Sequence, residues 1–220
     1  MKTLAHSFLC LILVLFSTSV FSQEIAERKV EKDFSPAPGK IRVESTFGKV
    51  EVLSWDQNRV QVNAHLWVES KNKDKAGNLL ERMDVDIQQD GNVVVVKSVF
   101  PSRMSSGNDT KFQIDFTIQT PVDMDIDLVS KYGSVFIEEI SGSINVDVAY
   151  GNFKADELLR GKEKPLNQLK LAYSSGSISE AGWLKTDLAY SKLSVNEAEA
   201  LVVLSKYSGI SVDESSSVVT

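Results

Sequence analysis

Cysteine is nearly absent from this chain of 220 residues, in which Cys10 is the single thiol. Cys10 lies inside a hydrophobic N-terminal run, so the chain after that run can form no disulfide bond within itself. An exported protein of this kind must be stabilised by core burial and backbone pairing. Histidine is almost as scarce, because only His65 follows the N-terminal run.

These two shortages exclude several classes of active site. With one histidine and no cysteine after residue 22, the usual ligand sets of zinc cannot be assembled. Ser-His-Asp catalysis would have to use His65, which lies inside an alternating segment and is expected to face solvent, and no GxSxG motif is present. The nucleotide motifs GxGxxG and GxxxxGK[ST] are missing as well. We therefore expect a protein that is not an enzyme and holds no cofactor.

Positive charge is in deficit. The chain has 24 Lys and Arg against 30 Asp and Glu, a formal net charge of -6, and losing Lys2 with a cleaved N-terminus would make it -7. Nucleic acids and anionic membranes attract basic surfaces, so an acidic chain is poorly suited to either partner. We expect no nucleic-acid partner, and the candidates that remain are an envelope protein or a glycan.

A long hydrophobic run occurs only at the N-terminus. Lys2 precedes the apolar stretch Phe8–Phe16, and the small residues Ser19 and Ser22 follow it. This order is typical of a secretory signal peptide, and the run is shorter than the about 20 residues of a membrane-spanning helix. The sequence predicts a signal peptide over residues 1–22. It also predicts export to the periplasm, the cell surface or the extracellular medium, with no transmembrane segment after cleavage.

The chain after the signal is divided by its hydrophobic pattern. Residues 23–39 are polar, end in "SPAPG" and are expected to form a leader with a turn. Residues 40–127 alternate apolar and polar side chains with period 2, which predicts half-buried strands. Helical spacing near residues 72–83 predicts one short helix, and Asp90-Gly91 between two apolar runs predicts a hairpin.

Residues 128–220 are repeats centred on the tyrosines. Each tyrosine is followed by Gly or Ser and, with one exception at Gly176, by apolar residues three and five positions later; an earlier copy uses phenylalanine. Successive tyrosines are 18, 23, 17 and 17 residues apart. The six aromatic positions are Phe47, Tyr132, Tyr150, Tyr173, Tyr190 and Tyr207.

The repeat has a geometrical consequence. An apolar residue at -4, the aromatic at 0 and apolar residues at +3 and +5 cannot share one face of an unbroken strand, because side chains alternate. Gly or Ser after the aromatic supplies a turn or bulge, so each unit is a strand, a corner and a strand. The near-constant period predicts stacked coils, that is, an all-β fold with a β-solenoid over residues 128–220.

Two interpretations of the aromatic positions remain. In the first, the rings point inward as a structural corner ladder, about 4.8 Å per step, and their hydroxyls reach backbone groups at the corners. In the second, the rings are exposed and bind carbohydrate or another ligand. Phe47 occupies the same place without a hydroxyl, which favours the structural ladder.

At this point the chain resembles the bacterial putative-adhesin family of exported β-strand-repeat proteins. The resemblance is carried by the signal peptide, "TFGKVEVLSWDQNRVQVNA", the short helix before "MDVDIQQDGNVVVV", and the repeats "KYGSVFI" and "AYGNFKA". It implies an exported, repeat-built β protein of the bacterial envelope. It brings no catalytic or binding residues with it.

One carboxylate row is a weak candidate for a metal site. Asp123, Asp125 and Asp127 lie on one strand face and carry the hard oxygen ligands that Ca²⁺ prefers. A calcium site needs about six to eight converging oxygens, whereas side chains on a flat strand face diverge. The apolar residues between the three aspartates explain the same pattern as core inside and charge outside.

The function expected from the sequence is that of a non-enzymatic cell-envelope protein, an adhesin or scaffold that presents a repeat β surface. The alternatives are a carbohydrate-binding or carbohydrate-active β-helix protein and a periplasmic accessory to a signalling system. The sequence ends at "SVDESSSVVT" without a recognisable cap. Either the strand at Val218 and Val219 covers the last repeat, or the repeats continue beyond residue 220.

Overall fold

The structure is a computed structural model that describes residues 24–102, 109–216 and 218–219. The predicted signal peptide, residues 1–22, lies outside the described residues. Within them the chain forms sixteen strands and one short helix, so the expected all-β class with one short helix is confirmed.

The N-terminal half contains seven strands and the helix. The strands are β1 (Glu24–Phe34), β2 (Lys40–Thr46), β3 (Lys49–Trp55), β4 (Val60–Ser70), β5 (Asp84–Asp90), β6 (Val93–Val99) and β7 (Thr110–Pro121), and the helix α1 (Lys73–Leu80) lies between β4 and β5. The other strands are β8 (Asp125–Lys131), β9 (Ser134–Ile140), β10 (Ile144–Ala149), β11 (Asn152–Leu158), β12 (Asn167–Ala172), β13 (Ser175–Ala189), β14 (Lys192–Lys206), β15 (Gly209–Ser215) and β16 (Val218–Val219).

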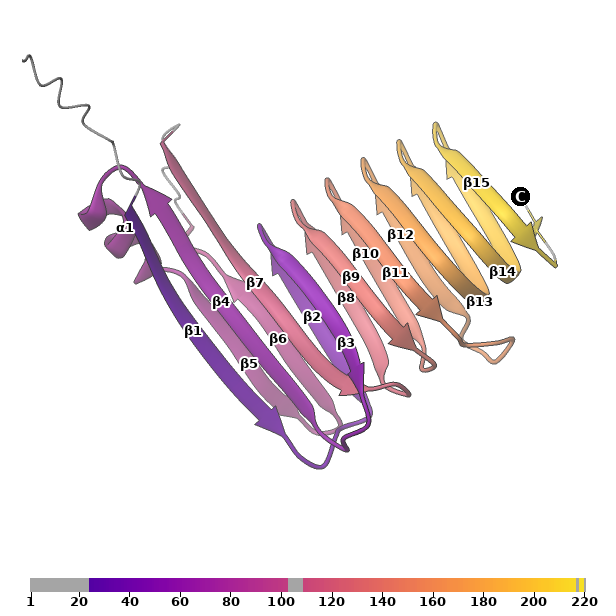
Figure 1. The fold of residues 1–220 in the computed structure, drawn as a ribbon, viewed down its shortest axis with the longest axis horizontal. Helices are drawn as coiled ribbons and strands as arrows, with labels where there is room; N and C mark the ends of the chain where they lie inside the picture. Colours follow the sequence, from indigo (N-terminus) through magenta and orange to yellow (C-terminus); the bar gives the residue numbers. More distant parts are fainter. Residues whose placement is uncertain (1–23, 103–108, 217, 220) are drawn as a thin grey trace, which may run out of the picture.

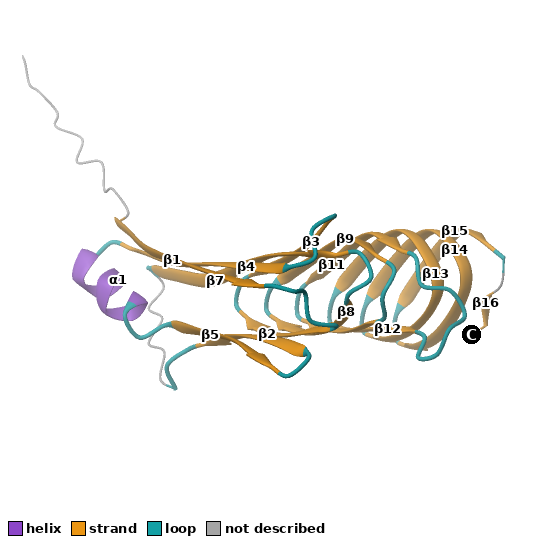
Figure 2. Ribbon diagram, turned by 90° about the horizontal axis from the view of Figure 1, so that it is seen from below, coloured by secondary structure: helices purple, strands orange, loops and turns teal. Residues whose placement is uncertain are grey.

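All sixteen strands belong to one sheet that doubles back on itself. Its main path runs β1-β4-β7-β3-β9-β11-β13-β12-β10-β8-β2-β6-β5, and β14 continues from β13 to β15 and β16. Figure 1 shows the strands side by side along the long axis, and Figure 2 shows the two layers that this path produces. Pairs β1-β4, β4-β7 and β5-β6 are antiparallel, and the other pairs are parallel.

The two layers are joined at both ends. Strands β13 and β14 are long and bend from one layer to the other, since β13 pairs with β11 through its first half and with β12 through its second. At the other end, Arg28 of β1 donates to the Met83 carbonyl at 2.7 Å and forms a 3.0 Å ion pair with Asp84 of β5. The result is a nearly closed, barrel-shaped sheet of mixed strand order.

The segment expected to be a leader is instead largely a strand. β1 pairs with β4 over its whole length, from Glu24 beside Ser70 to Phe34 beside Val60. Its partly buried residues Ala26, Val30 and Phe34 pack against the core. Most residues of β1 are charged because the strand lies at an edge of the sheet, where one face and one side meet water. With so few apolar residues, the strand could not be recognised from alternation of apolar and polar side chains.

The predicted helix and hairpin are both present. Asn72 caps α1 by accepting a hydrogen bond from the Lys75 backbone N–H at 2.9 Å, and Ala76 is its buried residue. Strands β5 and β6 form the hairpin expected at Asp90-Gly91, where Gly91 has a φ of +56°. With eight residues, α1 is too short to cross a membrane, and no other helix in the described chain could do so.

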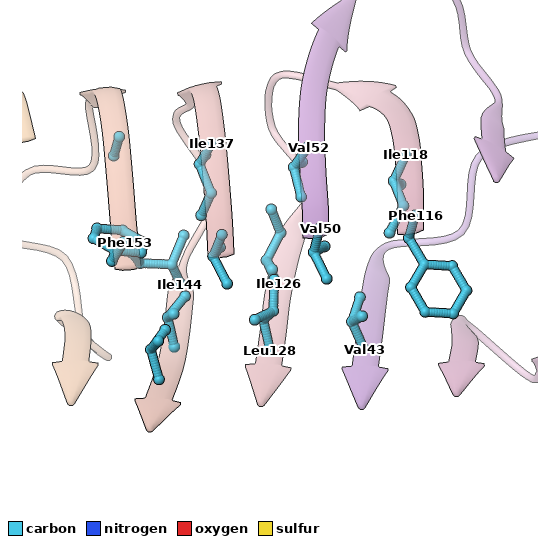
Figure 3. Packing of buried hydrophobic residues seen from close by; sticks show 14 of the residues in the cluster. Val43, Val50, Val52, Phe116, Ile118, Ile126, Leu128, Ile137, Ile144 and Phe153 are labelled. Atoms are coloured by element: carbon cyan, nitrogen blue, oxygen red, sulfur yellow. The ribbon is translucent and has the colours of Figure 1, made fainter. Parts of the chain in front are cut away.

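The core lies between the two layers and consists of alternate residues of each strand (Figure 3). The prediction that residues at +3 and +5 after each aromatic point inward is confirmed for the repeats with apolar residues there, for example by Phe153 and Val195. Residues at -4 are buried as well. Thr186, the polar exception at -4, occupies the same buried row between Leu169 and Val203, and its hydroxyl is 3.5 Å from the Val202 carbonyl.

Successive repeats are aligned residue by residue. Leu128, Val146 and Leu169 are direct neighbours in parallel strands, as are Val135 and Phe153. The sequence pattern placed a boundary between residues 127 and 128, but the strands on its two sides pair in the same aligned way, β2 with β8 and β3 with β9. The N-terminal strands and the repeats therefore share one sheet and one core.

Candidate interaction surface at the corner aromatics

The corner of every repeat is a residue in the left-handed backbone region. In the described chain, six residues other than glycine have a positive φ, between +50° and +57°, and they are the six corner aromatics. This conformation costs about 1–2 kcal/mol for a residue with a Cβ atom. The backbone N–H of each of the first five corners donates to a carbonyl of the next repeat, as from Tyr150 to Ala172 at 3.0 Å.

The predicted inward orientation of the tyrosine rings is wrong. Tyr132, Tyr150 and Tyr173 are 52–53% exposed, and Tyr207 is 76% exposed. The loss of strand parity was expected just after the aromatic, but the left-handed residue is the aromatic itself. The ring is thereby turned outward, and the Gly or Ser that follows takes the inward place.

Space explains why the first three repeats have glycine in that inward place. A Cβ atom on Gly133 would lie 1.9 Å from the Gly48 carbonyl oxygen, and one on Gly151 would lie 1.9 Å from the Gly133 carbonyl oxygen. Distances this short are far inside van der Waals contact. Any side chain would force the stacked corners apart.

The last three repeats have serine at this position. Its hydroxyl connects the stacked corners by hydrogen bonds, whereas the glycine corners touch through their backbones. Ser191 Oγ donates to the Ala189 carbonyl at 2.8 Å and accepts from the Ser174 N–H at 3.1 Å. Ser174 and Ser208 repeat both bonds in their own coils. The sequence showed only that Gly or Ser follows the aromatic, and the change from one kind of corner to the other depends on the neighbouring coil.

The corner rings form a continuous stack, which we call the corner aromatic row. Five successive steps from Phe47 to Tyr207 have ring-centroid distances of 4.9–5.2 Å and interplanar angles of 2–21°. Phe100 and Phe112 close the Phe47 end with edge contacts at 5.7 and 5.6 Å. Within the described chain, no tyrosine hydroxyl of the row bonds a corner backbone group, contrary to the structural interpretation of the sequence.

An open groove follows the row. Its volume is about 720 Å³, and its walls are four of the tyrosines together with the residues two positions after each corner, among them Asn152, Ser175 and Lys192. Because every ring face inside the row is covered by the next ring, the sides of the row offer ring edges and phenol hydroxyls. A sugar could therefore bind along the row by hydrogen bonds but could not stack on these faces.

The aspartate row proposed for calcium does not converge. Asp125 accepts from the backbone N–H and hydroxyl of Ser143, both at 2.7 Å, while Asp127 forms a 2.7 Å ion pair with Lys40. Asp123 lies in the exposed turn before β8. Among the described residues, no three His, Cys, Asp or Glu side chains form a group that could hold a metal ion.

His65 lies on the outer side of β4, as its strand position predicted. Its Nε2 atom is 2.8 Å from Glu27 Oε2 of β1, and its side chain is 36% exposed. The pair joins two neighbouring strands, and Lys29 lies directly across from His65 in the ladder. This geometry is that of a surface cross-strand contact.

We expect the corner aromatic row to stabilise the fold through its ring stacking. Tyr190→Ala removes two stacking contacts and should lower the free energy of unfolding by about 1–3 kcal/mol. Tyr190→Phe should change it little, because the hydroxyl bonds nothing in the described chain. Tyr190→Gly should be milder than Tyr190→Ala, since glycine tolerates a φ of +50°. Urea denaturation of the three variants checks this order, and an alanine variant as stable as the parent would contradict it.

Comparison with solved structures gave distant structural relatives. No protein-family model matches this chain, and no curated protein matches it. A putative cell adhesion protein from Clostridium sporogenes is similar in structure at 15% identity and a TM-score of 0.41, covering 88% of this chain and 96% of that one. A putative lipid binding protein from Parabacteroides distasonis has 10% identity, a TM-score of 0.31 and coverages of 87% and 97%. A putative adhesin from the same species has 9% identity, a TM-score of 0.28 and coverages of 90% and 94%.

Proposed function

We propose that this chain is an exported, non-enzymatic protein of the bacterial cell envelope, an adhesin or scaffold whose contact surface is the corner aromatic row with its groove. The observation that carries the proposal is the row itself. Five tyrosines, each about half exposed or more, stand in one line, and four of them border a groove of about 720 Å³. Exposed aromatic rings with polar tips are enriched at sites of protein recognition.

We also propose that residues 128–220 act as a short β-solenoid. Its support is the parallel, residue-by-residue pairing of neighbouring repeats, from β8 with β10 to β14 with β15. In such a stack each repeat contacts mainly its neighbours, and side chains at one repeat position form a straight line. A lengthwise array of equivalent groups suits a partner that is itself extended or repetitive.

The rigidity of the row supports a binding role. Each ring from Tyr132 to Tyr190 is held between two others, and the corners are fixed by backbone or serine hydrogen bonds, as at Ser191. A partner therefore has little side-chain freedom to immobilise on binding, which lowers the entropic cost of association. Stability alone would not require these rings to be tyrosine, because phenylalanine stacks equally well at Phe47.

A carbohydrate ligand is the second candidate, and the groove beside the row is the observation that favours it. Asn152, Ser175 and Lys192 add amide, hydroxyl and ammonium groups along its wall. The covered ring faces limit the tyrosines to hydrogen bonding. A glycan that needs stacking on aromatic faces is a poor fit, whereas an extended chain with regularly spaced hydroxyls is a good one.

The test is binding of the fluorescently labelled protein to intact bacteria and to a glycan array. The variant carries Tyr150→Phe, Tyr173→Phe and Tyr190→Phe, which keeps the stack and removes three hydroxyls. We expect saturable binding by the parent and at least about tenfold weaker binding by the variant, from the loss of several hydrogen bonds. His65→Ala, on a strand outside the row, is the matched control. Equal binding by parent and variant would contradict the proposed contact surface.

A further inference from the structure

A row of glutamates runs along the molecule in parallel with the corner aromatic row. One glutamate stands seven residues after each tyrosine, as Glu197 does after Tyr190. Strand pairing places each glutamate directly beside the next, so that Glu157 is flanked by Glu139 and Glu180, and Glu197 by Glu180 and Glu214. We call these five residues the glutamate row.

The glutamate row is not compensated within the chain. None of its five carboxylates forms an ion pair with a described residue, and like charges side by side in a sheet destabilise it. One outer row of the other layer instead alternates in sign, with Lys170 between Asp147 and Asp187. A repeated arrangement that works against stability suggests a contact that lies outside the single chain.

The tyrosine hydroxyl and the glutamate occur together or not at all. Five repeats have both, and the sixth has neither, because Phe47 has no hydroxyl and the residue seven positions later is Ser54. Stacking does not demand this coupling, since Phe47 stacks on Tyr132 at 5.1 Å as the tyrosines stack on one another. The donor and the acceptor therefore vary as a pair.

The two rows lie at opposite edges of the flattened sheet. Each tyrosine stands at the corner where the chain enters one layer, and each glutamate stands near the end of that crossing, before the chain turns to the other layer. In β14, for example, Lys192 follows the Tyr190 corner and Glu197 precedes the bend to the stretch that begins at Leu201. Five or six residues of extended strand separate the rows, a distance on the order of 20 Å. Figures 1 and 2 show these two edges of the stacked strands.

The edges also differ in charge. The positions from one before to two after each corner aromatic contain four lysines, Lys49, Lys131, Lys192 and Lys206, and no acidic residue. The glutamate edge is acidic in a chain whose net charge is -6. The positively charged loop after β11, residues 159–166, lies at the same edge, but its Arg160 bonds the Pro165 carbonyl instead of the row.

We propose that the corner aromatic row of one copy of this chain binds the glutamate row of a second copy lying beside it. Phenol O–H groups of the first copy donate to carboxylates of the second, and the lysines of the corner edge add attraction of opposite charge. The distance from one residue to the next is the same in both rows, because the same stacked strands carry both. Hydroxyls and carboxylates that have no partner among the described residues of their own chain then satisfy each other.

The contact joins two different surfaces, so a dimer still has one free row of each kind, one on each copy. Such a heterologous contact adds further copies in a line and produces an open lateral array unless rotation closes it. The accessible part of the glutamate row is Glu180, Glu197 and Glu214, which line a groove of about 320 Å³, since the loop of residues 159–166 lies at the level of Glu157. The inference does not depend on the proposed adhesin function, because it concerns only two copies of the chain.

Sedimentation velocity of the purified protein over a range of concentrations tests the association. The glutamate variant is Glu180→Gln with Glu197→Gln, and the tyrosine variant is Tyr173→Phe with Tyr190→Phe. Each should weaken self-association at least about tenfold, since charge-assisted hydrogen bonds are lost. Thermal melting checks folding, and the glutamate variant should melt no lower than the parent because it relieves repulsion. High salt should also weaken the association of the parent.

Mixing the two variants identifies the contact as heterologous. The glutamate variant keeps an intact corner aromatic row, and the tyrosine variant keeps an intact glutamate row. Each alone should sediment mainly as a monomer, whereas the mixture should form a dimer that grows no further. A parent that stays monomeric at every concentration, variants that associate as the parent does, or a mixture without dimers would each overturn the proposal. A parent that self-associates as expected but binds neither bacteria nor glycans would instead count against the proposed function alone.

Discussion

Replacing Phe153 by alanine is expected to lower the free energy of unfolding by about 3–5 kcal/mol, the usual cost of removing a buried phenyl ring. Phe153 is 2% exposed and lies between the two layers, near Ile137 and Ile144 (Figure 3). Its row contains valine in the repeat before it and glycine in the repeat after it. The ring is therefore the largest single side chain in its section of the core.

Gly176 explains how so large a ring fits into a repeat. A Cβ atom on Gly176 would lie 2.8 Å from Leu171 Cδ1, 2.9 Å from Leu193 Cδ1 and 3.8 Å from Phe153 Cδ1. The space that valine or leucine fills in other repeats is filled here by neighbouring side chains. Gly176→Ala should destabilise the parent by overpacking and do so less in a Phe153→Leu background, with a coupling energy of at least about 0.5 kcal/mol.

Urea denaturation with the slope m as a check on two-state unfolding gives these values. Phe136→Ala is the matched control, because Phe136 lies on the outer side of β9 beside Lys154 at 5.0 Å. It should lose about 1 kcal/mol or less, as expected for a surface position. A Phe153→Ala variant that loses no more than this control would show that the two layers are not packed as described.

Gly133→Ala is the second substitution with a large expected effect, about 1–3 kcal/mol or more in the free energy of unfolding. The added Cβ would meet the Gly48 carbonyl oxygen at 1.9 Å, and backbone cannot move aside as a flexible side chain can. The stacked corners on both sides would have to separate, which also disturbs the contact between the Phe47 and Tyr132 rings at 5.1 Å.

Two further variants separate this collision from other effects. Gly209→Ala has no atom within 4 Å of its new Cβ, so it should change the free energy of unfolding by less than about 0.5 kcal/mol. Ser191→Ala keeps the Cβ and removes a hydroxyl with two hydrogen bonds, and should cost about 1–2 kcal/mol. If Gly133→Ala proved as mild as Gly209→Ala in thermal and urea melts, the glycine corners could not be as close as the structure has them.

The strand pattern, the hairpin and the inward residues could be predicted because they depend on local sequence. Alternation with period 2 makes every second residue face the core, and this held at Val195 and Phe153. Gly91 marked its turn because the turn needs a positive φ. The aspartate row of residues 123–127 shows the limit of such patterns, since each carboxylate has its own neighbour or faces water instead of converging.

The orientation of the tyrosine rings could not be predicted in this way. A one-residue loss of parity was evident in every repeat, but two positions could have caused it, the aromatic or the residue after it. The choice is made by the corner of the neighbouring coil, whose carbonyl leaves no room for a Cβ at Gly133 or Gly151. That coil lies 85 residues away in sequence for Gly133 and 18 residues away for Gly151, and in direct contact in space for both.

The sequence by itself determined an all-β chain of tyrosine-centred repeats with Phe153, Val195 and their equivalents inside, because burial follows from alternation along one strand. Only the tertiary structure decided that the rings face outward, that residues 24–34 form an edge strand, and that five glutamates stand side by side opposite five tyrosines. These features depend on which coil lies beside which and in what alignment. Strand pairing, a contact between distant segments, sets that alignment, and no single segment contains it.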